Sequence, residues 1–328
     1  MRRRFALLAL SMATLLGATP TLAETARITI GIQNGVAYLP LHVMAAQHLV
    51  EKHAKKLGAD VTATIRNLGS TGFVRDGLIA DQIQFGVAGS PTLVTLYEKT
   101  RGDFRAASAV VSIPVTVNTN NPKIKSVCDF ADGDKIAVPA VKSSAQAVIL
   151  QMASKQRCGD PFRNDRFTIT MAHPDAYNAL MSGLITTHMA SPPFSYDEVE
   201  KGKGKVRTIL SGYDVLKSKA TLVFLITSDR FRLANPKVYR AVREALEEGE
   251  AYVRAHPKEA AQIYIKAEKS KSSEADVMRQ ITSPDVVYST TPQGLGMIAS
   301  FMASIGTAKK TYGWQELSMP ELRSRKGS

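Results

Sequence analysis

The chain has 328 residues, of which 44% are hydrophobic and 22% are charged. This composition is that of an ordinary globular protein and excludes a disordered, collagen-like or coiled-coil chain. The length suggests two or three domain-sized units with a large core. The formal net charge of +13 raises the question of a nucleic-acid partner.

The first 23 residues have the layout of a secretory signal peptide. Three arginines at positions 2–4 precede a mostly apolar run over residues 5–18, and residues 21–23 are Thr-Leu-Ala, with small residues at the first and third places. A membrane anchor is the alternative, but a spanning helix needs about 20 apolar residues. We therefore expect cleavage after Ala23 and secretion of the mature chain.

The positive charge is spread thinly along the mature chain. Without the signal peptide, 39 basic and 29 acidic side chains leave +10, which divides as +2 over residues 24–112, +4 over 113–221 and +4 over 222–328. The densest basic run, residues 201–205, is expected to be a solvated turn. A nucleic-acid interface concentrates its basic residues, so the sequence indicates no nucleic-acid partner.

The first part of the mature chain alternates between predicted strands and helices. Strands are predicted at residues 27–33, 61–67, 83–88 and 104–111. One helix is predicted over residues 38–57, ended by Gly58. Further helices begin at residues 69–72 and at Ser90-Pro91, where serine is a preferred N-cap and proline suits the first turn. Repeated strand-turn-helix units predict an α/β fold.

The middle of the chain repeats this alternation. Strands are predicted at residues 113–119, 135–139, 166–171, 186–190, 206–210 and 221–227. Ser143 and Gln146 have the spacing of a capping box at the start of a helix. After the last strand the pattern is helical, over residues 237–254, from Pro257, and over residues 272–281 and 292–305.

This order of elements predicts two α/β lobes with a cleft between them. The C-terminal helical block is too poor in strands to form a sheet of its own, so we expect it to pack on the first block. Lobe 1 is therefore predicted to be discontinuous, residues 24–112 and 222–328, and lobe 2 to be residues 113–221. The chain would cross between them twice.

The two cysteines, Cys128 and Cys158, both lie in the predicted lobe 2. A disulfide is chemically reasonable in an oxidising compartment and would close a loop of about 30 residues. Two unpaired thiols are the alternative.

Candidate ligand-binding residues lie in or near the turns between strand ends and helix starts. In open α/β sheets, ligands bind outside the carboxyl ends of the strands, where free N–H groups and helix dipoles can hold an anion. For any single serine, helix capping is an alternative explanation. The predicted ligand-binding residues are Asn34, Tyr38, Ser70, Thr71, Ser90, Lys142, Ser143, Ser144, His188, Ser191 and Phe194.

Signatures of catalysis or metal binding are missing from the sequence. It has no G-x-S-x-G, P-loop or G-x-G-x-x-G motif. His42, His48 and His53 are spaced by 6 and 5 residues, which does not place a pair at i, i+4 for a metal. His173 is expected at a helix start. No catalytic residue, metal or cofactor is therefore predicted.

The sequence resembles the substrate-binding proteins of ABC transporters in the nitrate/sulfonate/taurine family. Six short stretches, which occur in the same order, carry the resemblance. They are residues 31–41, 87–91, 138–146, 173–176, 181–183 and 191–194. The resemblance implies a type II periplasmic binding fold, with a hinge and a ligand caught between two lobes. It also implies delivery of the ligand to an ABC permease and its ATPase at the inner membrane.

The leading hypothesis is a monomeric periplasmic receptor, not an enzyme, that captures a small anionic solute such as a sulfonate, nitrate or taurine. One alternative is a secreted enzyme on the same fold, related to pyrimidine-precursor synthesis, which a reactive His or Cys cluster in the cleft would indicate. A ligand-sensing module is another alternative.

Overall fold

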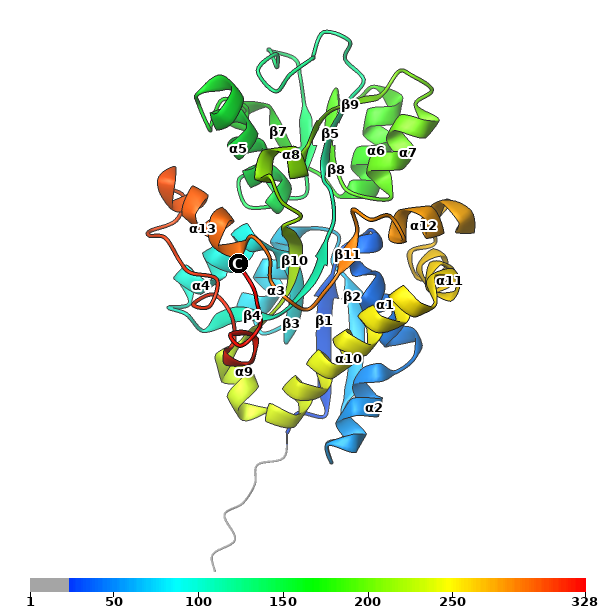
Figure 1. Ribbon diagram of the computed structural model, residues 1–328, viewed down its shortest axis with the longest axis vertical. Helices are drawn as coiled ribbons and strands as arrows, with labels where there is room; N and C mark the ends of the chain where they lie inside the picture. The colour runs from blue at the N-terminus through cyan, green and yellow to red at the C-terminus, as the bar shows by residue number, and fades with distance from the viewer. Residues whose placement is uncertain (1–23) are drawn as a thin grey trace, which may run out of the picture.

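A computed structural model describes residues 24–328, and the predicted signal peptide lies outside the described residues. Two units lie one above the other, each built around its own sheet (Figure 1). Over residues 24–328, no helix combines the length and apolar character that a membrane crossing requires.

The six-stranded unit has the strand order β11-β4-β10-β3-β1-β2. Its strands are β1 (Arg27–Ile32), β2 (Thr62–Asn67), β3 (Phe85–Gly89), β4 (Phe104–Ser112), β10 (Thr221–Ser228) and β11 (Val287–Tyr288). β1 pairs in parallel with β2 and β3, whereas β10 runs antiparallel to β3 and β4. A strand from the C-terminal part of the chain thus lies in the middle of an N-terminal sheet.

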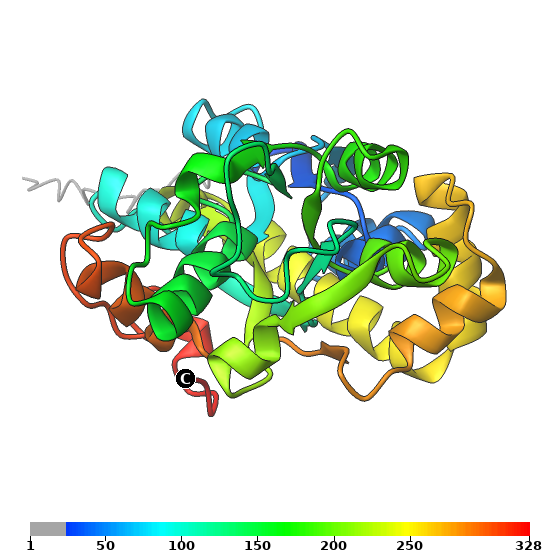
Figure 2. The same cartoon turned by 90° about the horizontal axis from the view of Figure 1, so that it is seen from above.

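Helices from both ends of the chain cover this sheet. They are the short 3₁₀ helix η1 (Val36–Tyr38), α1 (Leu39–Ala46), α2 (Leu49–Lys56), α3 (Thr71–Ile79), α4 (Ser90–Lys99), α9 (Asp229–Ala234), α10 (Pro236–Ala255), α11 (Pro257–Glu268), α12 (Glu274–Ile281), α13 (Leu295–Ser304) and η3 (Pro320–Leu322). The long α10 packs against α1 and α2. Seen from above, α11 and α12 lie on one flank and α13 on the other (Figure 2).

The single helix predicted over residues 38–57 is wrong, because the segment contains two helices. The break lies at His48, which has a left-handed backbone (φ 49°) between α1 and α2. A residue in this conformation cannot continue a right-handed helix, whatever the apolar spacing on either side.

The five-stranded unit has the strand order β7-β6-β8-β5-β9. Its elements are β5 (Thr116–Thr119), β6 (Ile136–Val138), α5 (Ala145–Cys158), η2 (Asp165–Phe167), β7 (Thr168–Thr170), α6 (His173–Ser182), β8 (Thr187–Ala190), α7 (Phe194–Lys201), β9 (Arg207–Ser211) and α8 (Gly212–Leu216). β6 pairs in parallel with β7 and β8, and β5 runs antiparallel to β8 and β9. In both sheets, therefore, three neighbouring parallel strands are followed by an antiparallel strand, β10 in one sheet and β5 in the other.

The chain passes between the two units over residues 113–115 and again over residues 217–220. The exact division into lobes at residues 112/113 and 221/222 stays a prediction. A disulfide joins Cys128 to Cys158 at the end of α5, with their Cα atoms 5.7 Å apart. It ties the loop before β6 to that helix.

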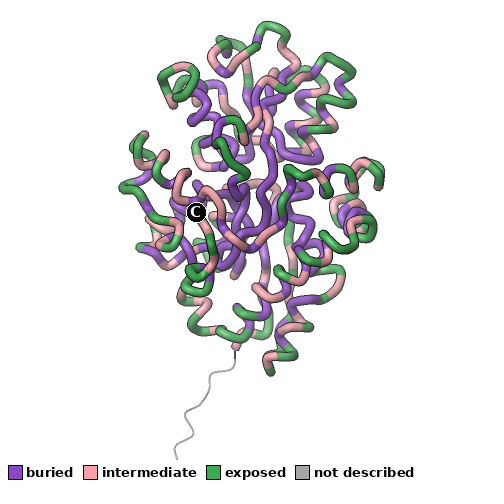
Figure 3. Tube along the Cα trace, in the orientation of Figure 1, coloured by how far each residue is buried: buried purple, intermediate pink, exposed green. Residues whose placement is uncertain are grey.

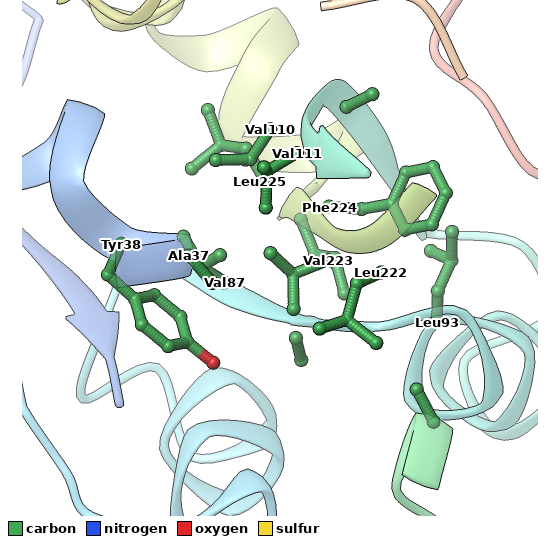
Figure 4. Packing of buried hydrophobic residues seen from close by; sticks show 14 of the residues in the cluster. Ala37, Tyr38, Val87, Leu93, Val110, Val111, Leu222, Val223, Phe224 and Leu225 are labelled. Carbon is green, nitrogen blue, oxygen red and sulfur yellow. The ribbon is translucent and has the colours of Figure 1, made fainter. Parts of the chain in front are cut away.

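The core follows the strands and the helix faces turned toward them (Figure 3). Every residue of β3 and β10 is buried, as expected for strands covered on both faces. Val87, Val110, Val223 and Leu225 lie close together where β3, β4 and β10 are neighbours (Figure 4). This rigid sheet fixes the positions of the loops that follow its strands.

Candidate ligand-binding cleft

An inner cavity lies between the two units. The six-stranded unit contributes Gln33, Asn34, Ala37, Tyr38, Thr71, Gly89, Leu222 and Val223. The five-stranded unit contributes Ala145, Gln146, His173 and Ser191. The cavity has a free volume of about 10 Å³, room for about one water molecule. In this arrangement the inner cavity has no room for a larger solute.

The polar residues of the cavity come from strand ends and helix starts. Asn34 follows β1 and Ser191 follows β8, while Thr71 is the first residue of α3 and His173 the first of α6. The carboxyl ends of neighbouring parallel strands lie at one edge of a sheet, where α/β proteins bind ligands. The fold therefore brings residues that are far apart in the sequence into one site.

An outer cavity of about 450 Å³ shares Asn34 with the inner one. Three aromatic rings line it, Tyr177, Phe194 and Tyr264. Its other lining residues are Pro174, Asn178, Pro193, Asp197, Lys201, Glu268, Lys269, Ser270, Lys271 and Ser272. Three lysines make this outer cavity the more cationic of the two.

The six-stranded unit holds its side of the cleft with hydrogen bonds. Thr71 Oγ1 donates to Gln33 Oε1 (3.0 Å), and Asn34 Nδ2 donates to Glu268 Oε2 (2.7 Å). Burial, reinforced by the Glu268 charge, raises the pKa of Tyr38 well above its ordinary value of 10. The Tyr38 hydroxyl consequently keeps its proton at any physiological pH.

The five-stranded unit contains a chain of buried polar side chains that begins at the cavity. Ser191 Oγ lies 3.2 Å from His173 Nε2, and His173 Nδ1 lies 2.8 Å from His188 Nε2. His188 Nδ1 in turn lies 2.5 Å from Glu198 Oε1. Burial, together with the neighbouring His188, lowers the pKa of His173 well below 6.5, so His173 is neutral at pH 7.

Direct contacts bridge the two units around the cleft. The Val36 N–H donates to the Pro192 carbonyl (3.4 Å), and Thr92 Oγ1 donates to the Ser143 carbonyl (3.1 Å). Near the outer cavity, Ser272 Oγ donates to Asp197 Oδ2 (3.2 Å) and Arg279 pairs with Glu200 (3.2 Å). These contacts hold the units together in a closed arrangement.

Five of the residues predicted from the sequence lie at the two cavities. Asn34, Tyr38, Thr71 and Ser191 line the inner cavity, and Phe194 lines the outer one. Their contact with a ligand stays a prediction.

The other predicted residues lie elsewhere or serve the backbone. Ser70 and Ser144 accept hydrogen bonds from the N–H groups of α3 and α5, so capping accounts for both. Ser143 Oγ donates to the Val141 carbonyl. The remaining positions are outside the inner cavity: Ser90 lines a separate small cavity beside the two connecting segments, Lys142 is exposed beside Asp165, and His188 is fully buried behind His173.

Several residues of the site are absent from the sequence-based set. Gln33 is buried and lies within the 31–41 stretch but outside the predicted turn at Asn34, and Glu268 lies at the end of a helix that the sequence does not connect to the cleft. The capping box predicted for Ser143 and Gln146 is wrong, because Ser144 caps α5 and the Gln146 side chain lies 3.3 Å from His173. A glutamine at a helix start was the available signal, but capping explained it locally.

Over residues 24–328, no group of three or more His, Cys, Asp or Glu side chains is arranged to hold a metal ion. His42 instead contacts Glu268, and His53 contacts Glu244 and Glu248. These histidines are pairing partners for carboxylates in the six-stranded unit.

A protein-family model described as NMT1/THI5 like matches residues 56–260, which is more than half of the chain. No curated protein matches the sequence.

Solved structures show the same fold at low sequence identity. The alkanesulfonate-binding protein SsuA from Xanthomonas axonopodis pv. citri, bound to MOPS, has 17% identity and a TM-score of 0.70, covering 90% of this chain and 98% of its own. The aliphatic sulphonate-binding SsuA of Escherichia coli has 17% identity and a TM-score of 0.64, covering 90% and 92%. A Candida albicans protein with the generic periplasmic binding protein fold has 12% identity and a TM-score of 0.65, covering 89% and 96%. The predicted fold class, a type II periplasmic binding fold, is confirmed.

Proposed function

The chain belongs to the NMT1/THI5-like family, and from this premise we propose that it is a periplasmic solute receptor of an ABC importer. It captures a small solute between its two units and delivers it to the permease and ATPase at the inner membrane. Two of the similar solved proteins are sulfonate-binding proteins and a third is a ligand-binding component of an ABC-type import system, which supports this role.

The inner cavity is the observation on which the proposal depends. It receives polar side chains from both units, and hydrogen bonds such as Val36 to Pro192 bridge the units beside it. A solute held there contacts both units at once and so stabilises the closed arrangement over the open one. Hinge closure of this kind is the usual way in which two-lobed receptors report an occupied site.

The charges around the cleft suggest how an anionic solute would be oriented. The side chains that line the inner cavity include no lysine or arginine, and its polar groups are amides, hydroxyls and a neutral imidazole. The lysines lie in the outer cavity, where Lys201 is paired with Asp197 while Lys269 and Lys271 are exposed. We place the anionic group of a sulfonate-like or taurine-like solute in the outer cavity and its uncharged or donor end in the inner one.

Thermal-shift screening followed by calorimetry tests the proposal. The panel contains sulfonates, nitrate, carboxylates and small aromatic compounds, and a bound solute raises Tm by mass action. The Gln146→Met variant should then bind at least tenfold more weakly, because it removes a polar group of the inner cavity. The matched control is Gln156→Met, an exposed position on the same helix. A panel without any binder, or equal affinity for both variants, would contradict the proposal.

An enzyme remains a second candidate because Ser191 lies within hydrogen-bond distance of His173 and is backed by His188 and Glu198. A hydroxyl, a histidine and an orienting group form the arrangement of an activated nucleophile. However, Pro192 and Pro193 follow Ser191 and have no N–H to hold an oxyanion. Hydrolysis of p-nitrophenyl acetate that disappears in Ser191→Ala would favour the enzyme over the receptor.

A further inference from the structure

We infer that Glu198, acting through His188, fixes the tautomer of His173 so that its Nε2 is a hydrogen-bond acceptor facing the inner cavity. The solute that binds there therefore carries an N–H or O–H donor at this end. The inference rests on the proposed receptor function and narrows its substrate class.

The direction of the hydrogen bonds between these buried side chains is determined at the end farthest from the cavity, where Glu198 meets Asn118. Asn118 Nδ2 donates to the Ser195 carbonyl (2.9 Å), and because a carbonyl can only accept, the orientation of this amide is known. The same Nδ2 lies 2.9 Å from Glu198 Oε2, which therefore accepts its second proton. Thr116 and Thr208 donate to Asn118 Oδ1 (2.9 and 2.7 Å) and complete its hydrogen bonds. Glu198 Oε2 is thus fixed as an acceptor.

From this carboxylate the donors and acceptors follow in order. With His188 as a neutral imidazole, which has one donor and one acceptor, its Nδ1–H donates to Glu198 Oε1 and its Nε2 is left to accept. His173 Nδ1 then donates to His188 Nε2 over 2.8 Å. The lone pair of His173 is left on Nε2, the atom nearest Ser191 and Gln146.

The His173 ring is held in this orientation by its surroundings. The Phe194 ring stacks on it, with centroids 5.6 Å apart and planes inclined by 17°, and the ring is 6% exposed. The hydrogen bonds to Nε2 from Ser191 Oγ (3.2 Å) and Gln146 Nε2 (3.3 Å) are both long. A donor group on a solute can displace either of these two side chains from His173 Nε2.

This arrangement discriminates between solutes. An N–H or O–H group placed at Nε2 gains a hydrogen bond in a water-poor cavity, where an unpaired polar atom is costly. A sulfonate or carboxylate oxygen at the same place would face a lone pair and is disfavoured. The end of the solute that enters the inner cavity is therefore a donor such as an amine, an amide N–H or a hydroxyl.

Replacing Glu198 by glutamine should reverse the direction of the hydrogen bonds that run from this side chain to His173. Asn118 still requires an acceptor, so the new amide turns its oxygen to Asn118 and its NH₂ toward His188 Nδ1. His188 must then accept at Nδ1 and donate from Nε2, and His173 must accept at Nδ1. The proton of His173 moves to Nε2, and the cavity now presents a donor in place of an acceptor.

The tautomers can be observed directly by long-range ¹H–¹⁵N correlation NMR of the protein labelled at histidine. The His173 signals are assigned from their disappearance in His173→Asn. We expect the Nδ1–H tautomer of His173 in the wild-type protein and the Nε2–H tautomer in Glu198→Gln. Glu259→Gln, an exposed position on α11, is the control and should leave the wild-type pattern unchanged. An Nε2–H or doubly protonated His173 in the wild type overturns the inference.

Binding of matched pairs provides the second readout. Aniline and toluene differ chiefly in a neutral nitrogen donor that replaces a methyl group. Taurine and propanesulfonate differ at the same place, where the donor is an ammonium and also adds a positive charge. In a pair that binds, the member with the donor should bind roughly tenfold to hundredfold more tightly to the wild type, and this preference should disappear in Glu198→Gln.

Equal affinity within each pair overturns the inference but leaves the receptor function standing. A wild-type protein that binds no solute of any class overturns the receptor function, and the inference fails with it. The wild-type spectrum and affinities do not depend on Glu198→Gln, so the inference stays testable even if that variant does not fold.

Discussion

Asn34 donates a hydrogen bond to Glu268 over 2.7 Å, although 234 positions of sequence separate them. The same carboxylate accepts from the Gly35 N–H and lies 2.9 Å from His42 Nε2. Glu268 therefore fastens the loop after β1, which lines the cleft, to the C-terminal end of α11.

Removing this carboxylate should loosen the loop. We expect Glu268→Ala to lower the free energy of unfolding by about 1–3 kcal/mol, because buried donors on Asn34 and Gly35 lose their acceptor. Solute affinity should fall as well, since Asn34 would lose its fixed position in both cavities. Urea unfolding and calorimetry measure the two effects. Glu259→Ala, exposed on the same helix, should change neither, and an equal effect in both variants would contradict this role.

A close approach of the two units at Gly89 predicts a steric block to closure. A Cβ atom at Gly89 would lie 2.9 Å from the Cβ of Ala145 in the opposite unit and 3.2 Å from its backbone nitrogen. Overpacking of this kind costs about 1–3 kcal/mol. Gly89→Ala should therefore weaken solute binding by about tenfold and leave the solute-bound protein more open in small-angle scattering.

A second glycine provides the control for this prediction. A Cβ at Gly72, in α3, would meet no atom closer than 3.7 Å. Gly72→Ala should keep the wild-type affinity and stabilise the helix by up to about 1 kcal/mol. Wild-type affinity in Gly89→Ala would show that the units do not need this contact.

Glu250 predicts the pH dependence of stability. It lies in α10 with 2% of its surface exposed, and among the described residues its Oε1 has no hydrogen-bond partner. Burial raises the pKa of its carboxyl well above the ordinary 4.5, and Arg254 at 3.9 Å offsets this only in part. The folded state thus binds more protons than the unfolded chain, so this group lowers stability as pH rises from about 4.5 to its raised pKa.

Glu250→Gln removes the buried charge. The variant should be more stable than the wild type by about 1–3 kcal/mol at neutral pH, and the difference should disappear as pH falls below 4.5. Unfolding curves at several pH values measure it, with the exposed Glu259→Gln as the control. A stability difference that does not change with pH would contradict the buried-charge explanation.

The disulfide is expected to stabilise the five-stranded unit. Cys128 and Cys158 are separated by 30 positions, and a loop of this size contributes about 3–4 kcal/mol in the chain-entropy description. The double variant Cys128→Ser, Cys158→Ser should lose about this much in urea unfolding and become insensitive to reductant. Its solute affinity should stay near that of the wild type, because neither cysteine lines the cavities. A reductant effect that persists in the double variant would mean that the bond is not its source.

Local patterns in the sequence were sufficient for much of the fold. Alternating and apolar runs located the main strands, and serine, proline and glycine marked helix ends, because these signals depend on neighbours a few residues away. The family resemblance is also confirmed. The break at His48 was missed because its left-handed backbone leaves no trace in the apolar spacing.

The contents of the cleft could be predicted only in part. Asn34, Thr71 and Ser191 were found because turns after strands meet at the cleft in any fold of this class. The sequence predicts a capping role for Gln146, because it does not show that the start of α6 lies against the Gln146 side chain.

By itself the sequence determined the fold class, the family and the turns from which a binding site is built. Only the tertiary structure decided what these turns do. It placed Glu198 behind His188 and His173, and it joined Asn34 to Glu268 across most of the chain. The reason is physical: periodicity and capping are local, whereas the direction of a buried hydrogen-bond chain depends on partners that only the folded sheet brings together.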